Sequence, residues 1–344
     1  MRVAPISPTG LGPELPAGCG PLSTAVCDTL AGSPQRLEHV GVAVGDVDPY
    51  GRDLQLALQL CYELHYRGFA GVDPGWEWEP SLLELRGRLE RMFLEQVRRD
   101  VGPIEATVDV AAEMDALTVE PVRGSGLSWH LRDSGTWVQM CEYFVQRSVY
   151  HLKEGDPHAW VIPRLAGGAK AAFVAIEFDE YGAGRGPQVH QELYADLMVA
   201  AGLDGGYLAY LGAVSAEALA AVNLMSLFGL HRRWRGATVG HFAATEITSP
   251  PGSRRLVSAL QRMDAPEECV TFYREHVEAD AVHEQVVRGE VVADLVAREP
   301  QLAPDVVFGI RAYDLVESRL AEQMLTAWQA DQSSLRSPLG PLFS

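Results

Sequence analysis

The 344-residue chain is 47% hydrophobic and 22% charged, which is typical of a globular protein with a substantial apolar core. Acidic residues outnumber basic ones by 46 to 28, and the net charge of -18 repels polyphosphate and anionic lipid over most of the surface. We therefore expect neither nucleic acid nor a membrane among its partners. The most apolar stretch, residues 216–230, is too short to cross a bilayer and is predicted to be a buried helix.

The cysteine count and the N-terminal composition indicate the compartment. There are five cysteines, an odd number, and none form a C-x-x-C pair, which argues against a disulfide framework. The first residues are rich in Pro, Gly and Ser and lack the apolar run of a secretory signal. We therefore expect a cytoplasmic protein.

The N-terminal third is predicted to hold an irregular arm followed by a helical extension. Residues 1–35 are rich in Pro and Gly and nearly uncharged, which favours irregular chain. Within the extension, residues 36–128, one amphipathic helix is expected from Arg52 to about Gly68 and a second from Pro80 to the Gly102-Pro103 break. The Thr and Val content of residues 106–110 favours a short extended segment.

The remainder of the chain is repeatedly helical in its apolar periodicity. The expected helices span residues 133–154, 162–180, 190–202, 214–230, 236–248, 253–262, 266–287 and 304–328. Pro250-Pro251 is expected to separate two of them. Strand-like alternation is scarce and the linkers are short, so an all-α bundle over residues 129–330 is predicted, with a C-terminal tail at 331–344.

One predicted helix carries a strip of metal-ligand types. His276, Asp280 and His283 are spaced i, i+4 and i+7, so their side chains share one face and climb about two turns. Imidazole with carboxylate suits iron, manganese or zinc, and the absence of cysteine argues against a structural zinc finger. A solvated face with one ion pair has the same letters, so the strip alone leaves both interpretations open.

Further carboxylates fall at helix ends or in apolar stretches. Glu180 ends one predicted helix and His190 opens the next, so the break can turn both toward one point. Glu246 lies in an apolar helical stretch, where an unpaired carboxylate is costly, and Glu154 closes an earlier helix. Each residue has an ordinary explanation as a surface group, helix cap or ion-pair partner. Together, four carboxylates and three histidines on successive helices match the ligands of a carboxylate-bridged di-iron bundle. The paired Glu-x-x-His motifs of ferritin-like proteins are missing, so a ferritin-like scaffold is less favoured.

This pattern resembles the heme-oxygenase-like di-iron oxidases and oxygenases, also called iron-containing redox enzymes, over about residues 130–330. The resemblance rests on seven positions, which in chain order are Glu154, Glu180, His190, Glu246, His276, Asp280 and His283. It implies an all-α, heme-oxygenase-like helical bundle with two Fe(II)/Fe(III) ions and O2 as co-substrate. It also implies that Glu180 and Asp280 lie near both irons, that the three histidines are nitrogen ligands, and that the other two carboxylates complete the shell. Heme is not implied.

The resemblance is strongest to N-oxygenating members, so we expect N-oxygenation of a small amine or guanidine-like substrate in specialised biosynthesis. The alternative within the same chemistry is desaturation or oxidative fragmentation of an amino or fatty acid. A different class is a metal-free helical hydrolase, with Cys141 or Cys269 as its nucleophile, or a non-catalytic partner protein. No flavin or nicotinamide fingerprint is found, so an external electron donor is expected. The sequence leaves open whether the N-terminal helices form a homodimer surface or cover the bundle.

Overall fold

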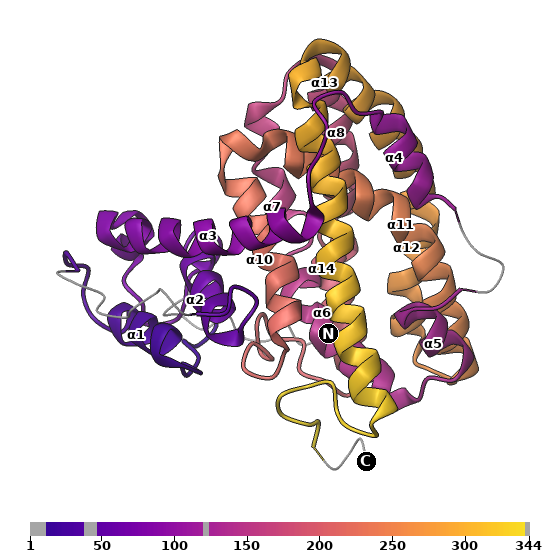
Figure 1. Cartoon of the computed structure of the whole chain (residues 1–344). Helices are drawn as coiled ribbons and strands as arrows, with labels where there is room; N and C mark the ends of the chain where they lie inside the picture. The colour runs from indigo at the N-terminus through magenta and orange to yellow at the C-terminus, as the bar shows by residue number, and fades with distance from the viewer. Residues whose placement is uncertain (1–11, 38–46, 120–123, 341–344) are drawn as a thin grey trace.

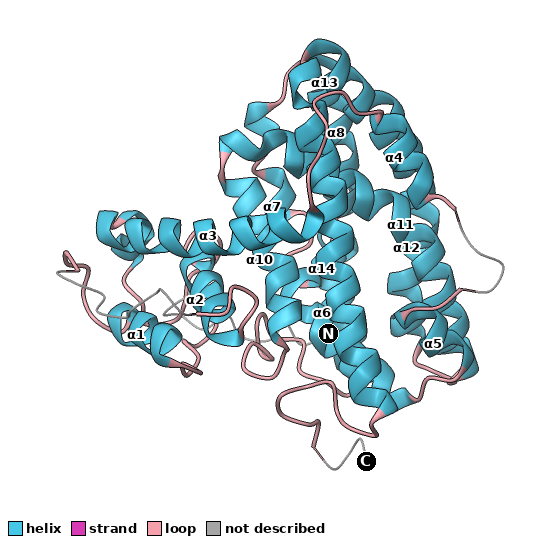
Figure 2. Cartoon of the chain, viewed as in Figure 1, coloured by secondary structure: helices cyan, strands magenta, loops and turns pink. Residues whose placement is uncertain are grey.

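The computed structural model describes residues 12–37, 47–119 and 124–340. Within these ranges helices are joined by loops and turns, and no strand is present (Figure 2). The expected all-α fold is thereby confirmed. The first seven α-helices are α1 (Pro21–Leu30), α2 (Arg52–Glu63), α3 (Pro80–Val101), α4 (Val110–Leu117), α5 (Leu127–Asp133), α6 (Trp137–His151) and α7 (Asp156–Ala159). The following ones are α8 (Gly167–Glu180), α9 (His190–Ala200), α10 (Ala216–Leu230), α11 (Arg235–Arg262), α12 (Glu267–Val286), α13 (Ala293–Arg298) and α14 (Ala303–Gln329). A π-helical turn, η7 (Val287–Val292), joins α12 to α13.

The bundle is arranged around the long helix α14, which packs along α11 (Figure 1). Helices α1 to α3 gather on one side of α14, and α4, α5, α11 and α12 lie on the other (Figure 1). Helix α10 is buried on nearly every face and packs against both α2 and α14. A helix that is apolar all round is stable only inside the protein, so α10 joins the N-terminal helices to the rest of the bundle. None of the described helices is long and apolar enough to cross a membrane.

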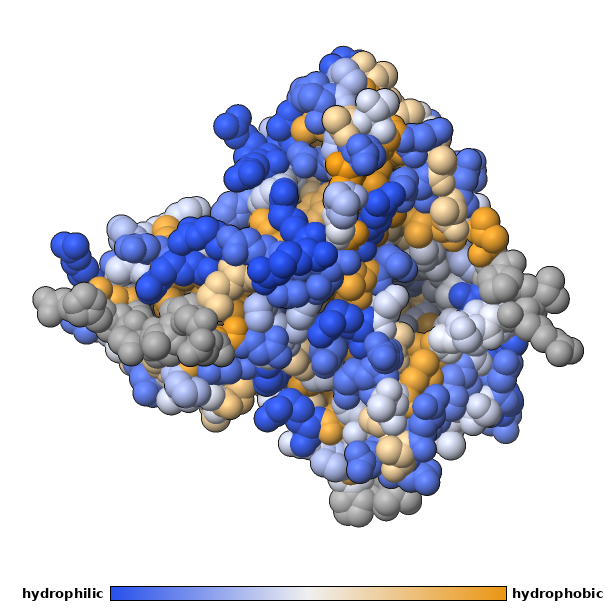
Figure 3. Space-filling model, in the orientation of Figure 1, coloured by the Kyte–Doolittle hydropathy of each residue, from blue (hydrophilic) through white to orange (hydrophobic). Residues whose placement is uncertain are grey.

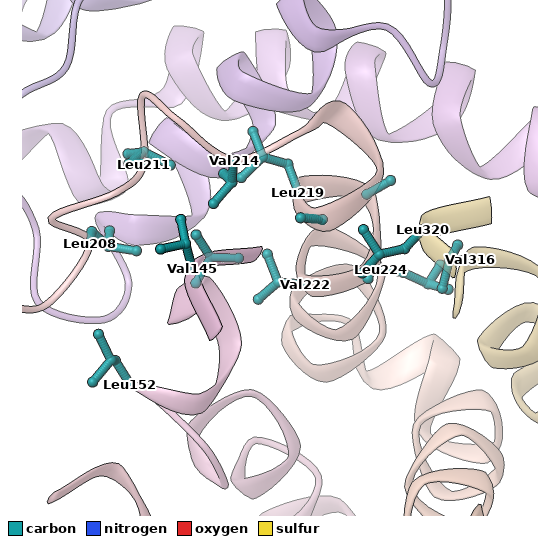
Figure 4. Close-up of a cluster of buried hydrophobic side chains, with 14 of the residues drawn as sticks. Val145, Leu152, Leu208, Leu211, Val214, Leu219, Val222, Leu224, Val316 and Leu320 are labelled. Carbon is teal, nitrogen blue, oxygen red and sulfur yellow. The ribbon is translucent and has the colours of Figure 1, made fainter. Parts of the chain in front are cut away.

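A continuous apolar cluster extends from the N-terminal helices into the bundle. It includes Leu22 of α1, Leu54 of α2 and Leu224 of α10. Figure 4 shows Val145 of α6, Leu152 just after it, and Leu208 of the loop before α10 as members of this cluster. The chain just after α6 is therefore held by core packing.

The expected irregular arm is wrong in part, because α1 forms within it. Leu22, Val26 and Leu30 are buried at i, i+4 and i+8. The first turn is capped by another helix: the Asp53 carboxylate of α2 accepts hydrogen bonds from the backbone N–H groups of Leu22 and Ser23 at 3.0 and 2.7 Å. Residues 1–11 lie outside the described residues.

The expected extended segment at 106–110 is also wrong, because residues 106 and 107 form a bend and α4 begins at Val110. The Asp109 carboxylate accepts a hydrogen bond from the backbone N–H of Ala112 and starts this helix. The helix expected to begin at residue 133 begins at Trp137 instead, after a capping box between Thr136 and Gln139.

Helix α11 continues through Pro250-Pro251, so the expected break there is wrong. The two prolines have no N–H groups to donate to carbonyls four residues earlier, which weakens the helix locally. Burial on both sides of the prolines, at Ile247 and Leu256, keeps the two halves in one helix. Tertiary packing here outweighs the local preference.

Candidate metal centre

The structure brings six of the seven sequence-predicted ligands together from five parts of the chain. They are Glu154 in the turn after α6, Glu180 at the end of α8, His190 at the start of α9, Glu246 within α11, and His276 and His283 on α12. All six are buried, with at most 6% of each residue exposed. The backbone of Asp280 lies in α12, but its side chain lies outside the described residues.

Four of these residues form a first ligand group: Glu154, Glu180, His190 and His276 each offer one atom within 4.8 Å of the others. His190 Nδ1 lies 2.7 Å from Glu180 Oε2, and His276 Nε2 lies 3.6 Å from Glu154 Oε2. The helix break between α8 and α9 therefore turns Glu180 and His190 toward each other, as the sequence suggested.

A second ligand group is formed by Glu180, Glu246 and His283, again within 4.8 Å. His283 Nδ1 lies 3.2 Å from Glu246 Oε2 and 3.9 Å from Glu180 Oε1. Glu180 belongs to both groups, with Oε2 toward His190 and Oε1 toward His283. A carboxylate in this position is suited to bridging two cations.

Hydrogen bonds orient two of the imidazole rings. His276 Nδ1 donates to the carbonyl of Phe272 at 2.7 Å, which leaves Nε2 on the side of Glu154. His283 Nε2 lies 3.1 Å from Asp179 Oδ2, and its Nδ1 lies on the side of Glu246. One nitrogen held by an acceptor and the other turned to the centre is the usual arrangement of a metal-bound histidine.

A further carboxylate, Glu177, lies near this centre and was missed by the sequence reasoning. Glu177 is 2% exposed, and neither of its side-chain oxygens has a hydrogen-bond partner among the described residues. Burial, together with Glu180 and Glu246, raises the pKa of Glu177 well above its usual value. Glu177 lies three residues, about one helical turn, before Glu180 on α8, so both side chains share one face of the helix. This spacing within an apolar stretch was the signal that the sequence offered.

The donor set fits metal ions with mixed oxygen and nitrogen preference, and iron is one of these. Glu154, Glu177, Glu180 and Glu246 are all buried, and like charges in a low-dielectric region repel unless a cation compensates them. For Glu154, burial alone would raise the pKa, yet His151 and His276 hold it well below its usual value. His151 Nδ1 lies 2.8 Å from Glu154 Oε1 and was not singled out from the sequence.

Two further buried histidines, which are not among the predicted ligands, lie beside the centre. His158 Nε2 and His241 Nδ1 are 3.1 Å apart and share a hydrogen bond. Burial lowers the pKa of His241 to about 3 and that of His158 well below its usual value, so both imidazoles are neutral. His241 is thus paired with His158 through the side chain.

A cavity of about 410 Å³ reaches the ligand groups, and Glu154, Glu180, Glu246 and His276 contribute to its wall. On the face shown in Figure 3 the surface is hollowed between α14 and α5, two helices that line the cavity. The rest of the wall includes many hydroxyl and charged groups. These residues include Thr245, Thr248, Ser249, Ser253, Arg147, Arg255, Asp314 and Glu317.

The family model of iron-containing redox enzymes matches residues 141–317, more than half of the chain. The chain belongs to this family. An iron-containing redox enzyme is an oxidoreductase, and all seven predicted ligands fall inside the matched segment. Helices α1 to α5 precede that segment. No curated protein matches the chain.

Neither Cys141 nor Cys269 of this iron-containing redox enzyme is an activated nucleophile. Burial raises the pKa of both Cys141 and Cys269 to about 12, so both thiols stay protonated near neutral pH. The Cys269 thiol lies 3.6 Å from the carbonyl oxygen of Leu197, and no cysteine is among the described residues that line the cavity. These observations disfavour the cysteine hydrolase considered above.

Proposed function

We propose that this iron-containing redox enzyme holds two iron ions, one in each ligand group, and that it oxygenates the nitrogen of a small amine or guanidine with O2. The observation that carries this proposal is Glu180, a buried carboxylate shared by both groups. When bound, the two irons supply electrons and Lewis acidity for reaction with O2. The seven residues of the sequence pattern are proposed as their ligands, Asp280 among them.

The cavity wall supports a cationic substrate. Arg147 forms a two-pronged ion pair with Glu317, with Arg147 Nη1 2.8 Å from Glu317 Oε1, so this pair is electrically neutral. Asp314, one turn earlier on α14, adds a carboxylate to the wall, and Arg255, whose Nε donates to Ser128 Oγ at 2.9 Å, adds a guanidinium. An ammonium or guanidinium group of the substrate can bind at Asp314, and the hydroxyls of α11 can orient the rest of the molecule.

The proposed reaction converts an amine, O2, two electrons and two protons into a hydroxylamine and water. The two additional electrons come from an external donor, which is a protein or a small reductant. Desaturation or oxidative fragmentation of an amino or fatty acid uses the same centre but places no oxygen on nitrogen. The fate of the O2 atoms therefore separates the two reactions.

The metal part of the proposal is tested by anaerobic Fe(II) loading followed by iron analysis and Mössbauer spectroscopy. We expect about two irons per chain in the wild type, about one in His283→Ala, and little in Glu180→Ala, because Glu180 serves both groups. Glu278→Ala is the matched control, since Glu278 is exposed on the same helix as His283. Equal iron content in all four proteins would refute the centre.

The reaction is tested with a panel of small primary amines and guanidines, a chemical reductant and ¹⁸O₂. Mass spectrometry is expected to find one ¹⁸O atom in an N–O bond of the product. An unsaturated or shortened product without ¹⁸O on nitrogen would identify the alternative reaction instead.

A further inference from the structure

The chain neighbours of three proposed ligands form a hydrogen-bond network behind the centre. Lys153 precedes Glu154, Tyr181 follows Glu180, and Gln191 follows His190. Gln191 Nε2 donates to the backbone carbonyl of Glu154 at 3.0 Å, and so ties the α9 start to the turn after α6.

Asp156, the first residue of α7, joins Tyr181 and Gln191 within this network. Its Oδ1 accepts hydrogen bonds from the Tyr181 hydroxyl at 2.9 Å and from Gln191 Nε2 at 3.1 Å. Gly155 has φ of 84°, a conformation that other residues rarely adopt, and it separates Asp156 from Glu154. A Cβ at Gly155 would also lie 3.0 Å from Glu177 Oε2. The tight turn therefore allows Glu154 to contribute to the candidate metal centre, while Asp156, two residues later, forms the hydrogen bonds of the network.

The network is anchored to the end of α2, which lies outside the segment matched by the family model. Lys153 Nζ lies 3.2 Å from Glu63 Oε2, and both side chains are fully buried. The Tyr207 hydroxyl donates to the same carboxylate at 2.8 and 2.9 Å. Arg67, just after α2, donates through Nη2 to Gln191 Oε1 at 2.6 Å and to the Leu152 carbonyl at 3.4 Å. Both sides of Glu154 are thus tied to the N-terminal helices.

A buried ion pair fixes geometry strongly, because separating its partners leaves two uncompensated charges in the interior. Lys153 cannot move away from Glu63 without that penalty, and the backbone of Glu154 moves with Lys153. The direct contacts of the network fall on the Glu154 carbonyl, on Lys153 beside Glu154 and on Gln191 beside His190. Glu154 and His190 belong to the first ligand group, whereas Glu246 on α11 and His283 on α12 belong to the second. The network therefore acts mainly on the first ligand group.

We propose that Glu63, Lys153 and Gln191 are positioning residues through which α2 sets the geometry of Glu154 and His190, and thereby the occupancy of the first metal position. This inference rests on the proposed function, because it requires a two-metal centre. It assigns the N-terminal helices a role in assembling the site.

Two variants separate positioning from folding. Gln191→Leu removes the direct hydrogen bond to the Glu154 carbonyl and leaves the Lys153–Glu63 pair in place. The double variant Glu63→Gln/Lys153→Met removes the buried pair as a whole, and replacing both charges preserves stability far better than removing one. The matched control is Arg52→Met, because Arg52 also ties α2 to the bundle, through the carbonyls of Leu211 and Ser215, away from the ligands.

The readout is anaerobic Fe(II) titration by calorimetry, with ⁵⁷Fe Mössbauer signals assigned to the two positions by His190→Ala and Glu246→Ala. Circular dichroism confirms folding of each variant. In Gln191→Leu and in the double variant we expect the first position to weaken about 10- to 100-fold while the second stays unchanged. Arg52→Met should retain both affinities.

The outcomes are distinguishable. A wild type that binds fewer than two irons refutes the proposed centre and, with it, the positioning role. A wild type that binds two, with both affinities retained in Gln191→Leu and the double variant, refutes only the positioning role. Equal weakening of both positions, or the same loss in Arg52→Met, shows a general stability effect and also overturns it.

Discussion

At the scale of single residues, Glu177 shows how the centre differs from an ordinary protein interior. A buried carboxylate without a hydrogen-bond partner is costly, and burial with Glu180 and Glu246 raises the pKa of Glu177 well above the usual 4.5. In the metal-free protein the folded state therefore keeps a proton that the unfolded state loses as pH rises. This contribution to stability is complete below about pH 4.5 and is lost as pH rises toward the folded-state pKa.

We expect Glu177→Gln to remove this pH dependence in the chelator-treated protein. The variant should match the wild type at about pH 4.5 and exceed it by about 1–3 kcal/mol in free energy of unfolding at about pH 8, as measured by urea denaturation. Glu275→Gln, at an exposed position on α12, should show no such difference. A constant difference across the pH range would contradict the assignment.

Sequence reasoning could find the ligand candidates because each lies at a helix end, in an apolar stretch or on the i, i+4, i+7 strip. Glu177 offered a weaker signal of the same kind, because its apolar stretch also contains the exposed Phe178. Asp156 offered none, because it resembles any acidic helix start. Their environments are created by contacts with distant segments, for example Tyr181 and Gln191 on Asp156.

At the scale of elements, the crossing of α11 and α14 sets the position of Glu246. The two backbones meet at glycines: a Cβ on Gly240 would overlap the carbonyl oxygen of Val306, and one on Gly309 would overlap that of Ala237. Gly240 precedes Glu246 by six residues on the same helix. Separating the helices at this crossing would therefore displace the ligand.

We expect Gly240→Ala to destabilise the protein by about 1–3 kcal/mol, because the added methyl group overpacks a backbone contact. Gly252→Ala on the same helix meets nothing within 4 Å and should be neutral or stabilising by up to about 1 kcal/mol, since alanine favours helix. Chemical denaturation checks both values, and anaerobic Fe(II) titration should show weaker binding only in Gly240→Ala. Equal stabilities for the two variants would contradict the close crossing.

The elements themselves were predictable where amphipathic periodicity and breaks coincide. Helices α9, α10, α12 and α14 begin and end within a few residues of the expected bounds. The failures have two physical causes. Local caps at Asp109 and Thr136 set the starts of α4 and α6, and at α1 and α11 distant residues supplied what the local sequence lacked. Asp53 caps α1 from another helix, and buried contacts hold α11 together through Pro250-Pro251.

At the scale of the whole molecule, a protein of net charge -18 gathers several carboxylates in its interior. The proposed ligands come from five separate parts of the chain, so the complete centre exists only in the folded state. On the proposed function, metal binding adds to the free energy of unfolding. The gain per position at a free metal concentration 100 times the Kd is about 2.7 kcal/mol.

We expect anaerobic Fe(II) to raise the free energy of unfolding of the wild type by the sum of two such gains. His190→Ala should lose the gain of the first position, Glu246→Ala that of the second, and Glu180→Ala both, because Glu180 belongs to both groups. Mg²⁺ at the same concentration is the control for simple screening of negative charge: it prefers oxygen ligands and cannot profit from three imidazoles. If Mg²⁺ stabilised the wild type as strongly as Fe(II), the stabilisation would come from screening of the surface charge. If Glu180→Ala kept either gain, the shared role of Glu180 would be wrong.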